Sequence, residues 1–162
     1  ELGSIMHLKN VGAVEKAIKE TITNGDGIQT LVLKLQEMPE FNRKRARATA
    51  ITETLTASSV AQFESYQQSP SVNGKRWLHS GAKKIKPRPH HVALNETMIG
   101  LDEKFKIGNE EGLYPRDTNL SAKERVHCHC VLAPSIDENI LLLTAEERNI
   151  IRDETLRKLG KV

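Results

Sequence analysis

The hydrophobic pattern of the sequence changes at residues 69–74, SPSVNG, and this change limits the possible folds more than any other feature. Before this segment, apolar residues recur at the three- and four-residue spacing of helices. After it, short β-prone pieces are separated by Pro, Gly and Asn. Since Pro and Gly interrupt regular structure, we predict an α+β fold with N-terminal helices including one long helix, a small irregular β-rich domain and a C-terminal helix.

Three helices are predicted before the break. Asn10 can cap the first helix, and Asn24-Gly25 can end it. A second, short helix stops before Pro39, because the residue before a proline disfavours helical geometry. A long helix then runs from about residue 41 to residue 68. Its predicted seam consists mostly of alanines, which would allow close packing: Ala46, Ala50, Ala57, Val60, Ala61 and Phe63.

After the break, three to five strands with long irregular connections are expected. The pieces that indicate strands are KRWLHSG, HHVALNE, MIGLDEKFKIG and VHCHCVLAP. Ser121 and Glu124 have the spacing of a capping box around one helical turn. Thr144 and Glu147 have the same spacing and predict a final helix that stops at Gly160.

The chain has the size of one domain with a modest core. It has 162 residues, of which 38% are apolar and six are aromatic (one Trp, two Tyr, three Phe). We divide it into a helical region (1–68), a β-rich module (69–136) and a C-terminal helix (137–162) that form one structural unit. No apolar run approaches the roughly 18 residues of a membrane span, so no membrane partner is expected. Because the chain begins with Glu1, we expect a processed form or a fragment.

Residues 127–130, with the sequence HCHC, contain the only two cysteines of the chain. In an extended segment successive side chains alternate between faces, so Cys128 and Cys130 are expected to point to the same side. Two cysteines separated by one residue argue against a disulfide scaffold. They indicate reduced thiols, or a metal site, in a protein inside the cell.

Zinc is the candidate cofactor, because thiolate and imidazole are among its usual ligands. Three ligands could come from His91, Cys128 and Cys130, and the fourth from His79, His90, His127 or His129. The spacing differs from a Cys-x-x-Cys knuckle, and the chain has no second cysteine pair. The alternative is that both cysteines are small core residues and that His91 hydrogen-bonds a backbone carbonyl.

The middle of the chain is basic, although the net charge is only +3. Residues 41–91 contain ten Lys and Arg residues but only two acidic ones. Candidate contacts to DNA phosphates are Arg43, Lys44 and Arg47 on the long helix and Lys83, Lys84 and Lys86 beyond it. Such contacts would be independent of base sequence and sensitive to salt. The alternative is a solvated or protein-facing basic surface.

Three groups of residues occur in an order that is characteristic of one protein family. They are Thr52-Glu53-Thr54 on the long helix, then Trp77 with Arg88 and His91, then Phe105, Pro115, Cys128 and Cys130. Over roughly residues 24–134 the chain thereby resembles the minor head, or head morphogenesis, proteins of tailed phages, the family that includes the F protein of phage Mu. It departs from the family pattern at Ile51, Glu96, His127 and His129, where Arg, Gly, Asn and Arg are usual.

The resemblance implies a non-enzymatic component of the phage head that is present in few copies and associated with the portal vertex. Its partners would be the portal and other head proteins, and some members of the family bind DNA. The expected location is the virion, in the head interior or at the portal vertex, and the host cytoplasm during assembly.

Two other functions are consistent with the residues. His91 with Cys128 and Cys130 could serve a metal-dependent or nucleotide-directed enzyme, although the sequence indicates no third orienting residue and no glycine-rich phosphate loop. A non-specific DNA-binding module is the third possibility. Trp77 and Phe105 are expected in the core of the β domain, whatever the function.

Overall fold

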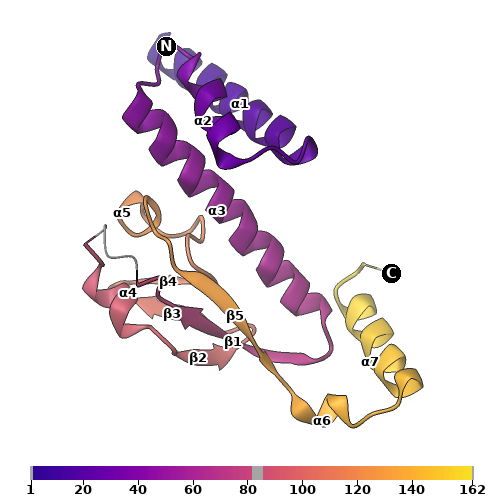
Figure 1. Cartoon of the computed structure of the whole chain (residues 1–162). Helices are drawn as coiled ribbons and strands as arrows, with labels where there is room; N and C mark the ends of the chain where they lie inside the picture. The colour runs from indigo at the N-terminus through magenta and orange to yellow at the C-terminus, as the bar shows by residue number, and fades with distance from the viewer. Residues whose placement is uncertain (1, 82–85, 162) are drawn as a thin grey trace. The chain divides into compact units, whose positions relative to one another are not determined.

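The computed structural model describes residues 2–81 and 86–161, with side chains described from residue 11 onward (Figure 1). It has the α+β architecture that the sequence predicts, with one long helix, short antiparallel strands and a C-terminal helix. Two compact units divide the chain, Glu1–Leu55 and Thr56–Val162. Each unit has its own apolar core, so the two are described separately.

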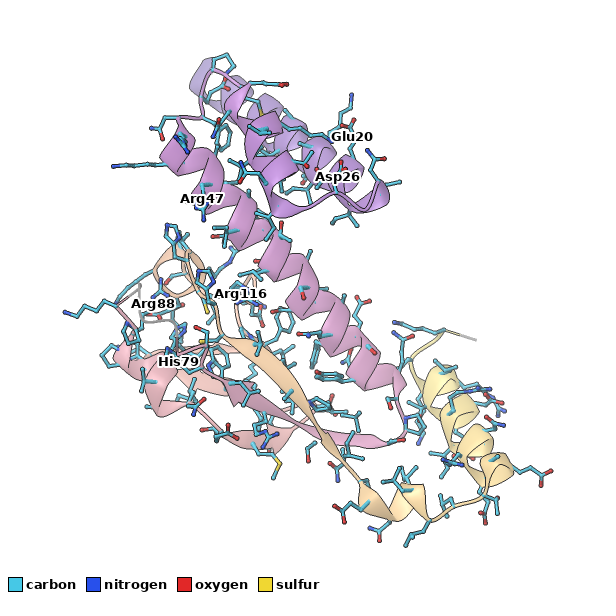
Figure 2. The ribbon with its side chains drawn as sticks, viewed as in Figure 1. Glu20, Asp26, Arg47, His79, Arg88 and Arg116 are labelled. Atoms are coloured by element: carbon cyan, nitrogen blue, oxygen red, sulfur yellow. The ribbon has the colours of Figure 1, made fainter. Side chains whose placement is uncertain are left out.

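The first unit consists of α1 (Leu2–Thr23), α2 (Ile28–Gln36) and the beginning of α3 (Arg43–Gln68). Gly25 has a positive φ of 69° and turns the chain after α1. Lys34 lies 3.8 Å from carboxylate oxygens of both Glu20 and Asp26, which Figure 2 labels. The core is made by one face of each helix and consists of Ala17, Leu31, Val32, Leu35, Ala46 and Ala50.

The second unit is built around a three-stranded antiparallel sheet with the order β2-β1-β5 (Figure 1). The central strand is β1 (Val72–Leu78), and its neighbours are β2 (Met98–Gly100) and β5 (Val131–Ile136). A separate hairpin joins β3 (Phe105–Ile107) to β4 (Glu110–Gly112). The observed strands therefore confirm the prediction of three to five short strands.

Trp77, on the central strand β1, lies in the middle of the second core. Its indole is fully buried and packs edge-on against Phe105 at 5.2 Å between ring centroids. Phe63 joins this cluster from α3, and the hydroxyl of Tyr66 donates to the carbonyl oxygen of Leu132 at 3.3 Å. The predicted core positions of Trp77 and Phe105 are confirmed, and burial of such large aromatic side chains contributes strongly to the stability of the unit.

Several local predictions were wrong. The piece HHVALNE is not a strand but the short helix α4 (Pro89–Ala93), with Pro89 in the first turn, where a proline is well tolerated. The segment with the two cysteines is extended only in part, because β5 starts after Cys130. In the predicted seam of α3, Ala46, Ala50 and Phe63 are buried, whereas Ala57 and Val60 are half-buried and Ala61 is exposed.

The two predicted capping boxes have different outcomes. At α5 (Ala122–Arg125) the side chain of Ser121 makes no capping bond, and its hydroxyl donates to Glu110 instead. At α7 (Ala145–Lys158) the box is present, since the Glu147 amide donates to Thr144 and the Thr144 amide donates to the Glu147 carboxylate.

The C-terminal segment adds little to the core. The short helix α6 (Glu138–Leu141) precedes α7, and none of the residues of α7, all of which are described, is buried. Leu142, Leu141 and Ile150 are 85%, 59% and 60% exposed. Within the described part of the chain, no helix combines the length and the apolar character that crossing a membrane requires.

Candidate metal centre

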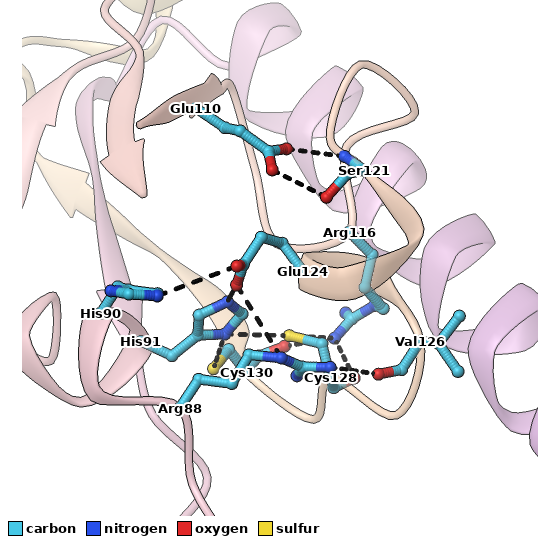
Figure 3. A network of polar contacts seen from close by, with 10 residues as sticks. All are labelled: Arg88, His90, His91, Glu110, Arg116, Ser121, Glu124, Val126, Cys128 and Cys130. Carbon is cyan, nitrogen blue, oxygen red and sulfur yellow. Dashed lines mark hydrogen bonds and ion pairs between the residues drawn. The ribbon is translucent and has the colours of Figure 1, made fainter. Parts of the chain in front are cut away.

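Three side chains that could bind a metal ion converge in the second unit (Figure 3). Nδ1 of His91 lies 3.5 Å from Sγ of Cys128 and 3.5 Å from Sγ of Cys130. The three ligand atoms all lie within 4.8 Å of one another, and each residue is only 2–3% exposed. Both cysteines are free thiols. The structure therefore brings together the three residues that the sequence predicts as ligands.

Local structure explains this convergence. His91 is on α4, and its ring packs edge-on against Trp77 of β1 at 5.5 Å between centroids. The cysteines come directly before β5, which pairs with β1 along its length, including Trp77 with Leu132. Arg88, at the N-terminus of α4, donates through Nη2 to the carbonyl oxygen of Val126 at 2.6 Å. Strand pairing and this hydrogen bond together hold the cysteine segment against α4.

Glu124 of α5 fixes the orientation of the His91 ring. Its Oε2 lies 2.9 Å from Nε2 of His91, and both side chains are 3% exposed. Since a carboxylate only accepts hydrogen bonds, Nε2 carries the proton and donates. In a neutral ring the lone pair is then on Nδ1, which faces the two sulfur atoms. A carboxylate that holds a histidine in this way is the usual second partner of a metal-bound imidazole.

Arg116 braces the backbone of the cysteine segment. Its Nη1 donates to the carbonyl oxygens of Cys128 and Cys130 at 2.8 and 2.7 Å, and its Nη2 donates to the hydroxyl of Ser59 on α3. The side chain, which Figure 2 labels, is buried in the second unit. A buried guanidinium with three acceptors fixes the positions of both cysteines and brings a positive charge close to their sulfur atoms.

The two thiols do not titrate independently. The hydrogen bond with Cys130 lowers the pKa of Cys128 below its usual value, and the contact with His91 acts in the same direction. The same sulfur contact raises the pKa of Cys130, and burial adds to this effect. The two shifts run in opposite directions, so the thiols titrate as a coupled pair in which the first thiolate forms more readily than in an isolated cysteine. A thiolate is the form of cysteine that binds metals.

A small pocket of about 30 Å³ opens beside the three groups. Three of the four candidates for the fourth ligand, His79, His127 and His129, line it together with Lys86 and Arg88. His79 accepts the amide hydrogen of Gly81 through Nδ1 at 3.1 Å. His90 lies instead on the other side of the carboxylate, with Nε2 3.9 Å from Oε1 of Glu124. No second group of candidate ligands is found among the described residues.

The remaining predicted site residues have varied positions. Arg43, Lys44 and Arg47 are exposed on α3 in the first unit, whereas the exposed Lys86 belongs to the second. Lys83 and Lys84 lie outside the described residues. Pro115 is buried, and Arg88 donates a hydrogen bond to the carbonyl oxygen of Val126.

Sequence reasoning missed two members of the site, Glu124 and Arg116. Glu124 was interpreted as part of a capping box, and it is the third orienting residue that the sequence did not indicate. Its spacing from Ser121 fits a cap equally well, so no local signal separates the two roles. Arg116 acts on residues 12, 14 and 57 positions away, and no local pattern encodes such contacts.

The fold and site describe an α+β protein with a helical N-terminal unit and a small antiparallel β module that contains a buried His-Cys-Cys group. Residues 12–133 match the family described as Phage Mu protein F like protein. Because the match covers most of the chain, the protein belongs to this family, which confirms the predicted resemblance.

Two relatives extend this result. The chain is 50% identical over 161 residues to "Uncharacterized protein YqbB" of Bacillus subtilis (strain 168), covering 98% of this chain and 53% of that protein. It is 25% identical over 131 residues to "Minor head protein GP7" of Bacillus phage SPP1, covering 80% of this chain and 42% of that protein. The chain thus spans about half the length of these relatives. No solved structure matches it.

Proposed function

We propose that this protein is a minor head component of a tailed phage or prophage that acts in head morphogenesis near the portal. The observation that carries the proposal is the family match over residues 12–133, together with the similarity to a protein named as a minor head protein. The role is one of assembly, in which the helices dock to partners and the β module is a compact rigid part. The protein would then be found in the virion, and in the host cytoplasm during assembly.

The C-terminal segment supports docking to another protein. Leu141, Leu142 and Ile150 are exposed although they are large and apolar, and such residues gain stabilisation when a partner covers them. Burying each would contribute about 1.5–3 kcal/mol. The portal and neighbouring head proteins are the partners that we propose for this surface.

The proposal is tested by co-expression of the chain with the portal protein of the same genome, followed by native mass spectrometry. We expect a complex with the portal, and we expect the double variant Leu142→Glu/Ile150→Glu to weaken it. Leu33→Glu is the matched control, since Leu33 is 54% exposed but lies in the first unit. If the chain binds no portal and is missing from purified heads, the proposal is wrong.

An assembly role also differs from an enzymatic one in its dependence on dose. When the gene is removed from the phage and supplied at graded levels, a head component limits the number of infectious particles in proportion to its amount. An enzyme restores assembly at a small fraction of that amount, because it turns over. Full restoration at trace levels would therefore favour the metal-dependent or nucleotide-directed enzyme.

Contact with DNA is the second part of the proposed role. Arg43, Lys44 and Arg47 are exposed on α3, and their three- and four-residue spacing puts them on one part of the helix surface. Three phosphate contacts would give a steep dependence of affinity on salt. Changing all three residues to Gln should lower the salt slope by about 3 and weaken binding to all sequences alike.

The matched control removes the same charge elsewhere. Arg148, Arg157 and Lys158 are exposed on α7. Changing them to Gln should leave the salt dependence of the DNA affinity nearly unchanged. Equal effects of the two triple variants would show that only net charge matters. Binding that persists at roughly 0.5 M salt would contradict phosphate contacts as its source.

A further inference from the structure

We propose that His91, Cys128 and Cys130 bind one zinc ion, and that its fourth coordination position faces the pocket lined by Lys86 and Arg88. This inference concerns a site to which no function is otherwise assigned, and it does not depend on the role in head assembly.

The distances fit a tetrahedral zinc ion. Sulfur at about 2.3 Å and nitrogen at about 2.0–2.1 Å from a tetrahedral ion lie roughly 3.5 Å from each other. Nδ1 of His91 is 3.5 Å from both Sγ atoms, and the three ligand atoms together lie within 4.8 Å. The two nitrogen-to-sulfur distances thus match those around one tetrahedral ion, and the 4.8 Å limit allows the same ion to contact all three atoms. Thiolate and imidazole ligands in a tetrahedral arrangement favour zinc over harder cations.

The hydrogen bonds around His91 favour a metal over simple thiol packing. Because Nε2 donates its hydrogen to Glu124, the imidazole offers a single lone pair at Nδ1, and that lone pair faces two sulfur atoms at equal distance. A single thiol could donate one hydrogen bond to it, and the second sulfur would then be linked to the imidazole only through the hydrogen bond between the two cysteines. A bound ion engages all three atoms at once.

The charges of the buried groups point in the same direction. Glu124 and Arg116 are each 1–2% exposed. Arg116 contacts both cysteines, and Glu124 contacts His91. One Zn²⁺, two thiolates, the Glu124 carboxylate and the Arg116 guanidinium sum to zero, and the partly exposed Arg88, 3.8 Å from Glu124, adds one positive charge at the edge of the site. An isolated buried charge is costly unless it is paired or coordinates a metal.

The fourth position is the one that the pocket reaches. His79, His127 and His129 line the pocket, but no ligand atom of theirs lies within the 4.8 Å group. Lys86 and Arg88 make the surroundings of that position basic. We infer that it takes a water molecule or a small anionic ligand rather than a fourth side chain, an arrangement of three protein ligands that leaves zinc accessible.

The first experiment measures zinc and cobalt binding by the reduced wild-type chain. We expect one equivalent of zinc per chain, and cobalt substitution is expected to give the thiolate-to-cobalt charge-transfer band and the visible bands of a tetrahedral site. These bands report sulfur coordination directly, so they do not depend on comparing variants. A wild-type chain that takes up neither zinc nor cobalt under reducing conditions would falsify the proposal.

Variants then assign the ligands. Cys128→Ser and Cys130→Ser should each lower the intensity of the charge-transfer band by about half and weaken zinc binding at least tenfold. His90→Gln is the matched control for His91→Gln, since it is the adjacent residue and points to the far side of Glu124. If His91→Gln binds cobalt with the same spectrum and affinity as His90→Gln, His91 is not a ligand.

Alkylation provides a readout that does not require a variant to fold. In the wild-type chain, zinc should slow the reaction of both cysteines with iodoacetamide, and a chelator should restore it. If one cysteine still reacts rapidly with zinc present while the other does not, the group is an activated thiol rather than a zinc site, and the proposal is overturned.

The fourth position is tested on the cobalt-substituted protein. Azide should shift the visible bands of the wild type, and His79→Ala, His127→Ala and His129→Ala should each retain the wild-type spectrum. Loss of the tetrahedral spectrum in one of these variants, combined with no response of the wild type to azide, would identify that histidine as a fourth ligand and overturn the open position. All of these measurements use the isolated chain, so their failure leaves portal binding untouched.

Discussion

At the residue scale, Glu124 shows how a single buried carboxylate can determine the chemistry of its neighbours. It accepts from Nε2 of His91 at 2.9 Å and lies 3.8 Å from Nε of Arg88. Its position decides which nitrogen of His91 is free, and therefore whether Nδ1 can act as a ligand. Residues that hold a metal-binding histidine often affect affinity nearly as strongly as the ligands themselves.

We therefore predict that Glu124→Gln weakens zinc binding by about tenfold, at the low end of the 10- to 100-fold range for such partners. The amide oxygen of Gln still accepts the hydrogen bond, but the negative charge 2.9 Å from Nε2 of His91 is lost. The affinity is measured by competition with a chelator of known strength. Glu111→Gln is the control, because Glu111 is exposed on β4, and an equal loss in both variants would contradict the role of Glu124.

Lys75 is the second residue whose burial has a measurable consequence. Its side chain is buried, donates to the carbonyl oxygen of Leu101 and lies 4.6 Å from the centroid of the Phe63 ring. Burial lowers its pKa to about 8, against the opposing effect of Asp102, Asp117 and Glu103. Because the folded pKa is below that of the unfolded chain, the unfolded state binds more protons between these two values.

The free energy of unfolding should consequently rise with pH between about 8 and 10.5 at this site. The test compares urea unfolding of the wild type and of Lys75→Met at pH 8 and pH 10. The free energy of unfolding of the wild type minus that of the variant is expected to increase from pH 8 to pH 10 by an amount on the order of 1 kcal/mol. The contributions of the other titrating groups cancel in this difference. A difference that stays constant with pH would show that Lys75 remains charged, or well solvated, in the folded chain.

At the scale of the elements, the sheet depends on a close contact at Gly74 of β1. A Cβ atom at this position would lie 2.7 Å from the carbonyl oxygen of Ile99 and 3.3 Å from Cβ of Ser135. Gly74 pairs with Gly100 of β2 and with Ser135 of β5, so any shift must move both neighbouring strands. The glycine is required here by space and not by its backbone angles.

Gly74→Ala should therefore destabilise the second unit by about 2 kcal/mol, as other overpacked core substitutions do. Chemical unfolding followed by the fluorescence of Trp77, the only tryptophan, measures this unit directly. Gly12→Ala is the contrasting control, because nothing lies within 4 Å of its Cβ position and α1 gains a better helix former. A Gly74→Ala variant as stable as the wild type would show that β2 can move away from the added Cβ atom with little loss of stability.

Elements with a clear period or cap could be predicted from the sequence, whereas elements defined by distant contacts could not. The helix α7 was predicted from Thr144 and Glu147, because a cap is a local signal. The helix α4 was missed, since five residues show no period and the one local signal was Pro89 at its start. The same limit applies to the site: His91 and the cysteines were predicted as a group, but Arg116 acts through long-range bonds.

At the scale of the whole molecule, the division into two units predicts where zinc should act. The candidate ligands all belong to the unit Thr56–Val162, and the unit Glu1–Leu55 has a separate core. A ligand that binds only the folded state stabilises the folded unit by about 2.7 kcal/mol when its free concentration is a hundred times its dissociation constant. That stabilisation should remain within the unit that contains the ligands.

Hydrogen exchange followed by mass spectrometry, with zinc and with chelator, tests this prediction. Amides of β1, α4 and β5 should exchange more slowly with zinc, and amides of α1 and α2 should exchange at the same rate in both conditions. The helix α7 is an internal reference, because none of its residues is buried and its exchange should be fast throughout. Equal protection of α1, α2 and the sheet by zinc would mean that the two units unfold together, since a metal confined to one unit stabilises the other only through cooperative unfolding.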